Sequence, residues 1–188
     1  MDNRKDFIAA AILDTQATIR SIDVKVAALL VAVLTPLANT NRVFGHLSHF
    51  GTMSPKWLFL TLAITFLGAW IAAFTALVRS IGAIDNPATH IINSGSLTGS
   101  FYSGGLYKMG LLDVFLNRDL IKASKDPVSF LAAIPNDAAS IEKELAFEHM
   151  KLVYIRETKL NRLNWGLKFS LIWLVLGIGI FLSSKYLF

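Results

Sequence analysis

The sequence predicts an all-α integral membrane protein with three transmembrane helices and a helical cytoplasmic segment between the second and the third. Apolar residues make up 54% of the 188 residues and charged residues only 16%, whereas globular proteins have about 25% charged residues. Residues 57–78 contain no charge and residues 165–188 contain two. Each stretch exceeds the roughly 20 residues that a transmembrane helix needs, so part of this protein is expected to face lipid.

The N-terminal region predicts one long helix that rises from the cytoplasm into the bilayer. Mostly apolar residues recur there at steps of three and four, which places them on one helical face. This stripe consists of Ile8, Ile12, Thr15, Ile19, Ile22 and Val26. We interpret residues 1–22 as a cytoplasmic amphipathic helix and residues 23–41 as the first transmembrane helix. A kink is expected at Pro36, because proline lacks the N–H group that a helix uses.

Residues 57–78 form the second predicted transmembrane helix, and Arg79 closes it. The preceding residues, 42–56, are polar and include Gly51 and Pro55. Such residues are typical of turns. We therefore predict a loop there, on the periplasmic side.

Residues 79–164 form the predicted cytoplasmic segment. It opens with a turn at Asp85-Asn86-Pro87 and continues with a loop rich in glycine and serine over residues 93–107. One or two short helices are expected within residues 110–135, interrupted by Pro127 and ended by Pro135.

A long helix without proline follows from about residue 140, with Asn136 or Ser140 as its N-cap. It continues into the third predicted transmembrane helix, residues 165–188. At about 1.5 Å per residue it would be roughly 65–70 Å long, so its first half must stand in the cytoplasm. A flexible point is expected at Asn164-Trp165-Gly166, because glycine is less favourable in a helix than alanine by about 1 kcal/mol.

The orientation follows from the basic residues. With three spans, fifteen of the eighteen Lys and Arg residues lie on one side of the membrane, together with the N-terminus. Basic residues gather on the cytoplasmic side of membrane proteins. This places the N-terminus in the cytoplasm and the C-terminus in the periplasm. We assign the net charge of +5 to this orientation and predict no nucleic-acid polymer as a partner.

Several features occur in a specific order along the chain. The first span is entered through Asp23-x-Lys25-x-Ala27-x-Leu29-Leu30, and the second ends at Arg79. An aromatic pair, Phe101-Tyr102, and the sequence Phe130-Leu131 follow. A charged helix then runs from Glu144-Leu145 through Lys159 to Leu163. This order and spacing resemble those of the transmembrane effectors of the Pycsar antiphage system, over most of residues 10–183.

The resemblance implies a function in abortive infection at the bacterial inner membrane. In that family an infection-triggered cyclase makes cyclic CMP or cyclic UMP, and the effector then damages the inner membrane. Three helices are too few to enclose a pore, so we expect a homo-oligomer in the lipid bilayer. The alternative function is a passive membrane anchor or scaffold that recruits a partner protein.

Two clusters of basic residues are the predicted ligand-binding sites. One contains Arg118 and Lys122, and the other contains Arg156 and Lys159. A cyclic nucleotide monophosphate carries one negative charge, which the fork of an arginine side chain fits. The alternatives are contact with anionic lipid headgroups, or solubility alone. Residues 93–107 could also hold a phosphate on backbone N–H groups, or could be a flexible connector.

The sequence predicts no enzyme, no cofactor and no metal site. His46 and His49 have a spacing that could hold a metal on a helix, but we prefer a solvated loop because no acidic residue is near them. Glu142, Glu144 and Glu148 alternate with basic residues, which favours a face of salt bridges. No catalytic residues are assigned.

Four charges mark the predicted membrane boundary: Asp23, Lys25, Arg79 and Lys168. Charged side chains at the edge of a span can extend to the interface. A second interpretation is an ion pair between helices, for instance Asp23 with Lys168. Such a pair would fix the helix positions and could be a latch that ligand binding releases.

Overall fold

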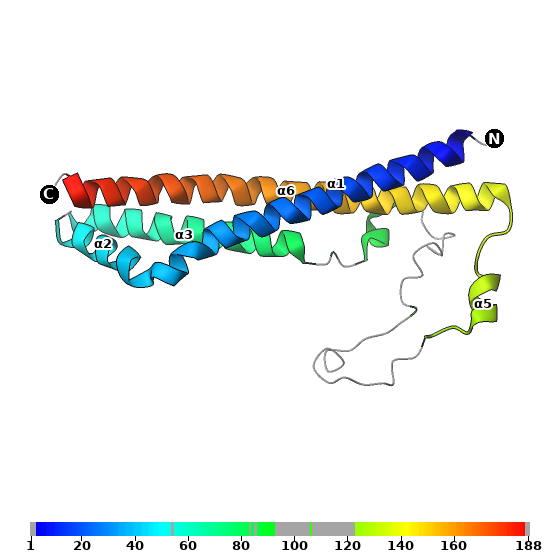
Figure 1. Ribbon diagram of the computed structural model, residues 1–188, viewed down its shortest axis with the longest axis horizontal. Coiled ribbons are helices and arrows are strands. Elements are labelled where there is room, and N and C mark those ends of the chain that lie inside the picture. Colours follow the sequence, from blue (N-terminus) through cyan, green and yellow to red (C-terminus); the bar gives the residue numbers. More distant parts are fainter. Residues whose placement is uncertain are drawn as a thin grey trace. The chain divides into compact units, whose positions relative to one another are not determined.

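The computed structural model describes residues 3–53, 55–82, 84, 86–92, 106 and 123–186, and these are almost entirely helical, with no strand among them. The elements in chain order are α1 (Asn3–Leu34), η1 (Thr35–Asn39), α2 (Thr40–Met53), α3 (Lys56–Ile81), η2 (Pro87–His90), α5 (Pro127–Ala132) and α6 (Ala138–Tyr186). Figure 1 shows these elements along the chain. The predicted all-α class is confirmed.

Among the described residues, three helical stretches are long and apolar enough to cross a membrane by their length and composition. They are Arg4–Thr52, Lys56–Ile81 and Ala138–Lys185. The first two contain the predicted segments 23–41 and 57–78, and the third contains residues 165–185 of the predicted segment 165–188. The first and third stretches are much longer than one membrane span needs. The sequence predicted this, because the N-terminal and C-terminal helices were both expected to continue beyond their apolar segments.

The chain divides into two compact units. Unit 1 contains residues 1–16 and 86–154, and unit 2 contains residues 17–85 and 155–188. Helices α1 and α6 therefore supply residues to both units. Unit 2 holds most of the apolar sequence, and unit 1 holds most of the predicted cytoplasmic segment.

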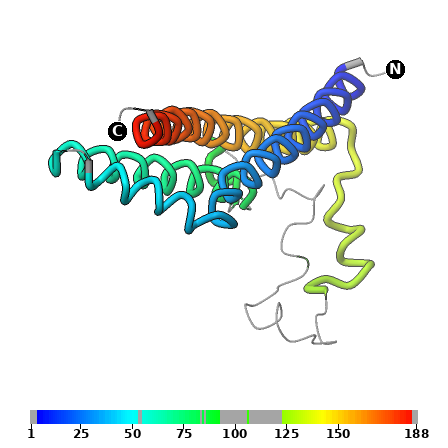
Figure 2. Tube along the Cα trace, turned by 60° about the vertical axis from the view of Figure 1, so that its left-hand side comes forward, coloured from blue at the N-terminus to red at the C-terminus, as the bar shows by residue number. Residues whose placement is uncertain are grey.

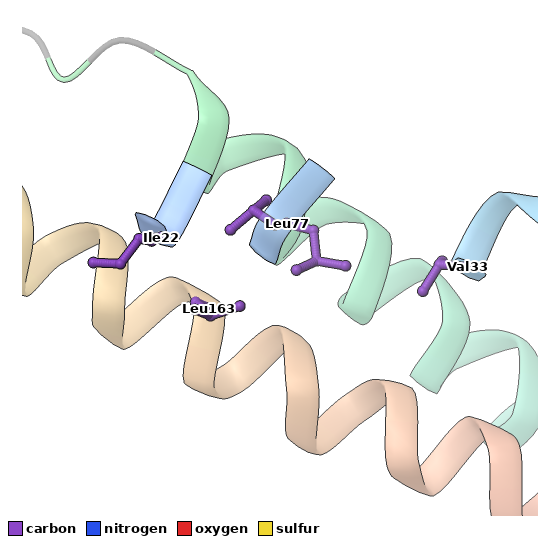
Figure 3. Close-up of a cluster of buried hydrophobic side chains, with 5 residues drawn as sticks. Ile22, Val33, Leu77 and Leu163 are labelled. Atoms are coloured by element: carbon purple, nitrogen blue, oxygen red, sulfur yellow. The ribbon is translucent and has the colours of Figure 1, made fainter. Parts of the chain in front are cut away.

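The core of unit 2 lies between the C-terminal parts of α1 and α6 and helix α3. Its fully buried residues are Ile22, Val26, Val33, Leu77 and Leu163, and Figure 3 shows how those it labels converge from three helices. Helix α3 and the C-terminal half of α6 run side by side (Figure 1 and Figure 2). The indole Nε1 of Trp70 donates to the Val33 carbonyl at 2.9 Å and so joins α3 to the end of α1.

Gly166 allows the close contact between α6 and α3. A Cβ atom at this position would lie 2.7 Å from Leu77 Cδ2, well inside van der Waals distance. Helix α6 continues through Gly166 without interruption. The sequence predicted a flexible point at Asn164-Trp165-Gly166, but in the structure the glycine makes room for a packed leucine.

Helix α1 ends at Leu34, close to Pro36, where the sequence predicted a kink. The α-helical hydrogen bonding gives way at Thr35–Asn39 to a 3-10 turn with Pro36 in its first turn. Proline cannot donate the backbone hydrogen bond that would continue an α-helix.

The connection that was predicted as a polar loop is instead helix α2. Val43, Leu47 and Phe50 recur at steps of four and three, which places them on one helical face. Phe50 is 6% exposed and belongs to a second buried cluster with Phe66 of α3 and Ile180 of α6. The packing of this apolar stripe overrides the turn preference of the glycines and polar residues.

Unit 2 presents large apolar side chains on its outer surface. Examples on α3 are Trp57, Leu60, Ile64 and Ile71, which are 56–70% exposed. Examples on α6 are Leu171, Leu174, Val175 and Ile178, which are 49–68% exposed. Extended apolar surfaces of this kind mark contact with a membrane or a partner protein. The outward faces of these helices therefore suit a lipid environment.

Unit 1 joins the start of α1 to the first part of α6 by polar contacts. Arg4 Nη1 donates to Glu142 Oε1 at 2.6 Å. Thr15 Oγ1 lies 3.5 Å from His149 Nε2. Glu148 is 1% exposed and pairs with Lys151 one helical turn later. The charged face that the sequence predicted here is thus partly buried and paired.

The helix starts in unit 1 differ from the prediction in detail. Pro127 begins α5, because proline is favourable in a first turn where no N–H donor is needed. Residues 110–122, where a further short helix was predicted, lie outside the residues that the structure describes. The side chain of Asp126 caps α5 by accepting from the backbone N–H groups of Val128 and Ser129. Asp137 performs the same role for α6, accepting from the Ser140 N–H at 2.8 Å, where Asn136 or Ser140 was predicted to be the cap.

The predicted turn near Pro87 is present in the residues that the structure describes. Asn86 adopts a left-handed conformation with a φ of 35°. Asparagine accepts this conformation more readily than most residues. Pro87 then begins η2.

Candidate functional site

An ion pair between α1 and α6 is the centre of the candidate site in unit 2. Lys159 Nζ donates to Asp23 Oδ1 at 2.5 Å. The lysine side chain is 10% exposed and the aspartate side chain 40% exposed. An ammonium group that has lost most of its water needs such a partner.

Helical register places this pair one turn from the apolar core. Lys159 precedes the core residue Leu163 by four positions, and residues four apart lie on the same helical face. Asp23 directly follows the core residue Ile22. The apolar packing of Ile22 and Leu163 therefore brings the two charged groups together.

Two further hydrogen bonds join α6 to the last turn of α3. Ser80 Oγ donates to the Lys159 carbonyl at 3.2 Å, and the serine is fully buried. Arg162 Nη1 donates to the Arg79 carbonyl at 2.5 Å. The last four carbonyls of a helix have no partner within it, so Arg162 satisfies one of them.

We call Asp23, Arg79, Ser80, Lys159 and Arg162 the boundary cluster. It links three helices by one ion pair and two hydrogen bonds at one end of the apolar core. Each of these contacts joins α6 to α1 or to α3. The cluster is therefore suited to holding the helices in one arrangement.

The predicted pair between Asp23 and Lys168 is not the one that the structure contains. Lys168 lies nine residues after Lys159, which corresponds to a rotation of about half a turn at 3.6 residues per turn. The two lysines thus point to opposite sides of α6. Lys168 Nζ lies 4.6 Å from the centroid of the Trp165 ring, and its side chain is exposed.

The predicted ligand-binding residues have different surroundings. Arg156 donates from Nε and Nη2 to Glu157 Oε1, at 3.0 and 2.7 Å, whereas Lys159 pairs with Asp23. Arg118 and Lys122 lie outside the residues that the structure describes, and so does the Gly/Ser-rich stretch except for Leu106. The structure therefore does not bring Arg156 and Lys159 to one shared partner.

The other predicted boundary charges are on the surface. Lys25 and Arg79 have exposed side chains, as expected for groups that reach toward an interface. Only the backbone carbonyl of Arg79 takes part in the boundary cluster.

Sequence reasoning missed Ser80 and Arg162. The available signal for Ser80 was its position three residues after the core residue Leu77, which places a small polar side chain on a packed face. Arg162 had no comparable signal, because its partner is a backbone carbonyl whose availability depends on where α3 ends.

The histidines of α2 do not form a metal site with neighbouring acids. Within residues 3–53 and the other parts that the structure describes, no three His, Cys, Asp or Glu side chains are close enough to hold a metal. His46 instead places Nδ1 3.3 Å from Ser184 Oγ, and its ring meets the Phe181 ring edge-on at 5.0 Å between centroids.

Comparisons with protein-family models, with curated proteins and with solved structures find no match to this chain.

Proposed function

We propose that this protein is a cyclic-nucleotide-triggered effector of bacterial antiphage defence, which disrupts the integrity of the inner membrane as a homo-oligomer. The proposal places residues 1–22 and 79–164 in the cytoplasm and the three apolar segments in the bilayer. Support comes from the resemblance in the order of sequence features and from the lipid-compatible outer surface of unit 2. No catalytic role is proposed.

The observation that carries the proposal is the sharing of α1 and α6 between the two units. Each helix supplies residues to a largely polar unit and to an apolar one. The Asp23–Lys159 pair joins the same two helices at the edge of the apolar core. A ligand that changes the contacts of either helix thus has a direct route to the membrane segments.

In the proposed mechanism Lys159 exchanges its partner. In the resting state its ammonium group is neutralised by Asp23. The single negative charge of cyclic CMP or cyclic UMP would replace that carboxylate, with Arg156 as the neighbouring cation. A ligand shifts a conformational equilibrium only if it binds one state better than the other. Nucleotide binding would therefore favour the state in which the Asp23–Lys159 pair is broken.

Oligomers would then form or reorganise through the apolar faces of α3 and α6. The proposal assigns membrane damage to this step, because one copy has only three helices. The rearrangement of α1 against α6 would change which apolar faces are available to a neighbouring copy.

The functional test is expression of the protein with and without a pyrimidine nucleotide cyclase, followed by membrane potential with a voltage-sensitive dye. We expect depolarisation only when both are present. A passive anchor or scaffold would leave the membrane potential unchanged in both cases, and that result would exclude the effector.

The ligand test is binding of cyclic CMP and cyclic UMP, with cyclic AMP and cyclic GMP as controls, to the purified protein. Lys159→Met should weaken binding by about tenfold or more, because a charged hydrogen bond contributes about 1.5–3 kcal/mol and 1.4 kcal/mol corresponds to tenfold. Asp23→Asn should tighten binding, because it removes the competing carboxylate.

Lys168→Met is the matched control for these variants, since Lys168 is an exposed lysine on the opposite side of the same helix. It should bind nucleotide like the unmodified protein. If Asp23→Asn and Lys159→Met weaken binding equally, the pair supports the structure without contacting the nucleotide. Unchanged affinity in both would move the site to Arg118 and Lys122 or to residues 93–107.

A further inference from the structure

Unit 2 contains an apolar cavity of about 270 Å³ between α2, α3 and α6. Leu47 of α2, Phe66 of α3, and Trp173 and Gly177 of α6 are among the residues that line it. For scale, an apolar cavity of about 150 Å³ can bind benzene. This cavity is therefore large enough for a substantial part of a hydrocarbon chain.

The cavity results from two local features of the sequence. Pro36 interrupts the first helix, and the chain leaves α1 through η1 before α2 begins. Gly177 of α6 lines the cavity without a side chain of its own, and Phe66 packs closely against it, since a Cβ atom there would lie 3.2 Å from Phe66 Cε2. A second apolar cavity of about 80 Å³ shares Pro36, Val43, Phe66 and Trp173 with the first, so apolar space continues beneath η1.

The cavity reaches the outer surface of unit 2. Leu174, Ile178 and Phe181 line it and are also 43–50% exposed. In the proposed function this surface faces lipid, so hydrocarbon chains are the molecules present at the opening. His46 also lines the cavity, and its ring packs against Phe181.

The charged side chains of α2 and of the C-terminal part of α6 are all basic. Arg42 is adjacent to the lining residue Val43 on α2, and Lys185 follows Phe181 by four positions on α6, so that they lie on one face. Both side chains are exposed. Residues 40–56 and 166–186 contain no Asp or Glu. A phosphate group near the opening would therefore meet basic side chains from both α2 and α6.

We propose that this cavity binds one acyl chain of a phospholipid, with the lipid phosphate held near Arg42 and Lys185. The proposal rests on the membrane location in the proposed function, but not on nucleotide binding. The acyl chain supplies the apolar contacts that the lining side chains offer, and the phosphate matches the basic opening. The bound lipid would thereby hold α2 against α3 and α6.

The test compares two glycines of α6 that are two residues apart. Gly177→Leu would place a side chain in the cavity. Gly179→Leu is the matched control, because a Cβ atom at Gly179 meets nothing within 4 Å. Both proteins are purified in detergent with dioleoylphosphatidylglycerol, and native mass spectrometry measures the fraction that retains one lipid.

We expect the unmodified protein and Gly179→Leu to retain one lipid, and Gly177→Leu to retain at least tenfold less. Equal retention by Gly177→Leu and Gly179→Leu would overturn the proposal. If the unmodified protein retains no lipid and Gly177→Leu instead converts a dimer to a monomer, the occupant is a second copy of this chain and the lipid is excluded.

A second measurement does not depend on whether Gly177→Leu folds. Trp57→Phe with Trp165→Phe removes two exposed tryptophans and leaves Trp70 and Trp173. One equivalent of a chain-brominated phosphatidylglycerol in detergent should then quench the remaining fluorescence by roughly half or more, since Trp173 lines the cavity and Trp70 lines the adjoining one. Absence of quenching at one equivalent would overturn the site. Failure of the unmodified protein to enter the membrane fraction would instead contradict the proposed membrane function.

Discussion

Breaking the Asp23–Lys159 pair should destabilise the protein unequally, depending on which partner is removed. In Asp23→Asn, the ammonium group of Lys159 stays at a position where the side chain is only 10% exposed. In Lys159→Met, the carboxylate of Asp23 stays where its side chain is 40% exposed and can regain water. Methionine also keeps much of the apolar packing of the lysine stem.

The expected magnitudes follow from these exposures. Breaking a fully buried pair costs about 3–5 kcal/mol, and an exposed pair contributes about 0.2–1 kcal/mol. Because one partner is buried and the other is not, we expect about 2 kcal/mol for Asp23→Asn and about 1 kcal/mol for Lys159→Met. The double variant should lose less than the sum, by about 1 kcal/mol of coupling.

The assay is equilibrium unfolding in mixed micelles with increasing sodium dodecyl sulfate, monitored by circular dichroism. Lys168→Met again serves as the control and should change the free energy of unfolding by less than about 0.5 kcal/mol, as surface substitutions usually do. Additive effects in the double variant would refute the pairing. A larger loss in Lys159→Met than in Asp23→Asn would refute the argument from burial.

Three other predictions concern packing, topology and pH. Gly166→Ala should destabilise unit 2 by about 1–3 kcal/mol because the new Cβ overlaps Leu77. In a protein that already carries Leu77→Ala, the same glycine substitution should cost less free energy of unfolding. A loss of equal size in Gly179→Ala would contradict this explanation. A reporter fused after residue 50 should be periplasmic and one at residue 130 cytoplasmic, and reports from the same side would exclude the three-span topology. Hydrogen bonds from Ser129, chiefly from its hydroxyl, lower the pKa of Asp126. The stabilisation of α5 by the Asp126 cap should therefore be complete above the ordinary aspartate pKa, and it should be lost as the pH falls through the lowered pKa. Amide exchange of Ser129 should accelerate over that range, and Asp126→Ala should abolish the pH dependence.

The sequence by itself determined the helical class and the three apolar segments. Both are local properties, because a span requires only a continuous run of about twenty apolar residues and a helix requires a repeat of 3.6. The interruption at Pro36 was predictable for the same reason, since proline acts on its own backbone. The turn at Asn86 and Pro87 also follows from the conformational preferences of these two residues.

Only the tertiary structure decided which helical faces meet, and the candidate site depends on that. Lys159 and Lys168 are both lysines at the edge of the same apolar helix, and only the packing of Leu163 against Ile22 selects Lys159 as the partner of Asp23. As a glycine within a helix, Gly166 predicted a flexible point, whereas in the structure Leu77 of α3 packs against it. Residues 40–53 became a helix because Phe50 has a buried position between α3 and α6. Each of these outcomes joins residues that are distant along the chain, so no local pattern could reveal it.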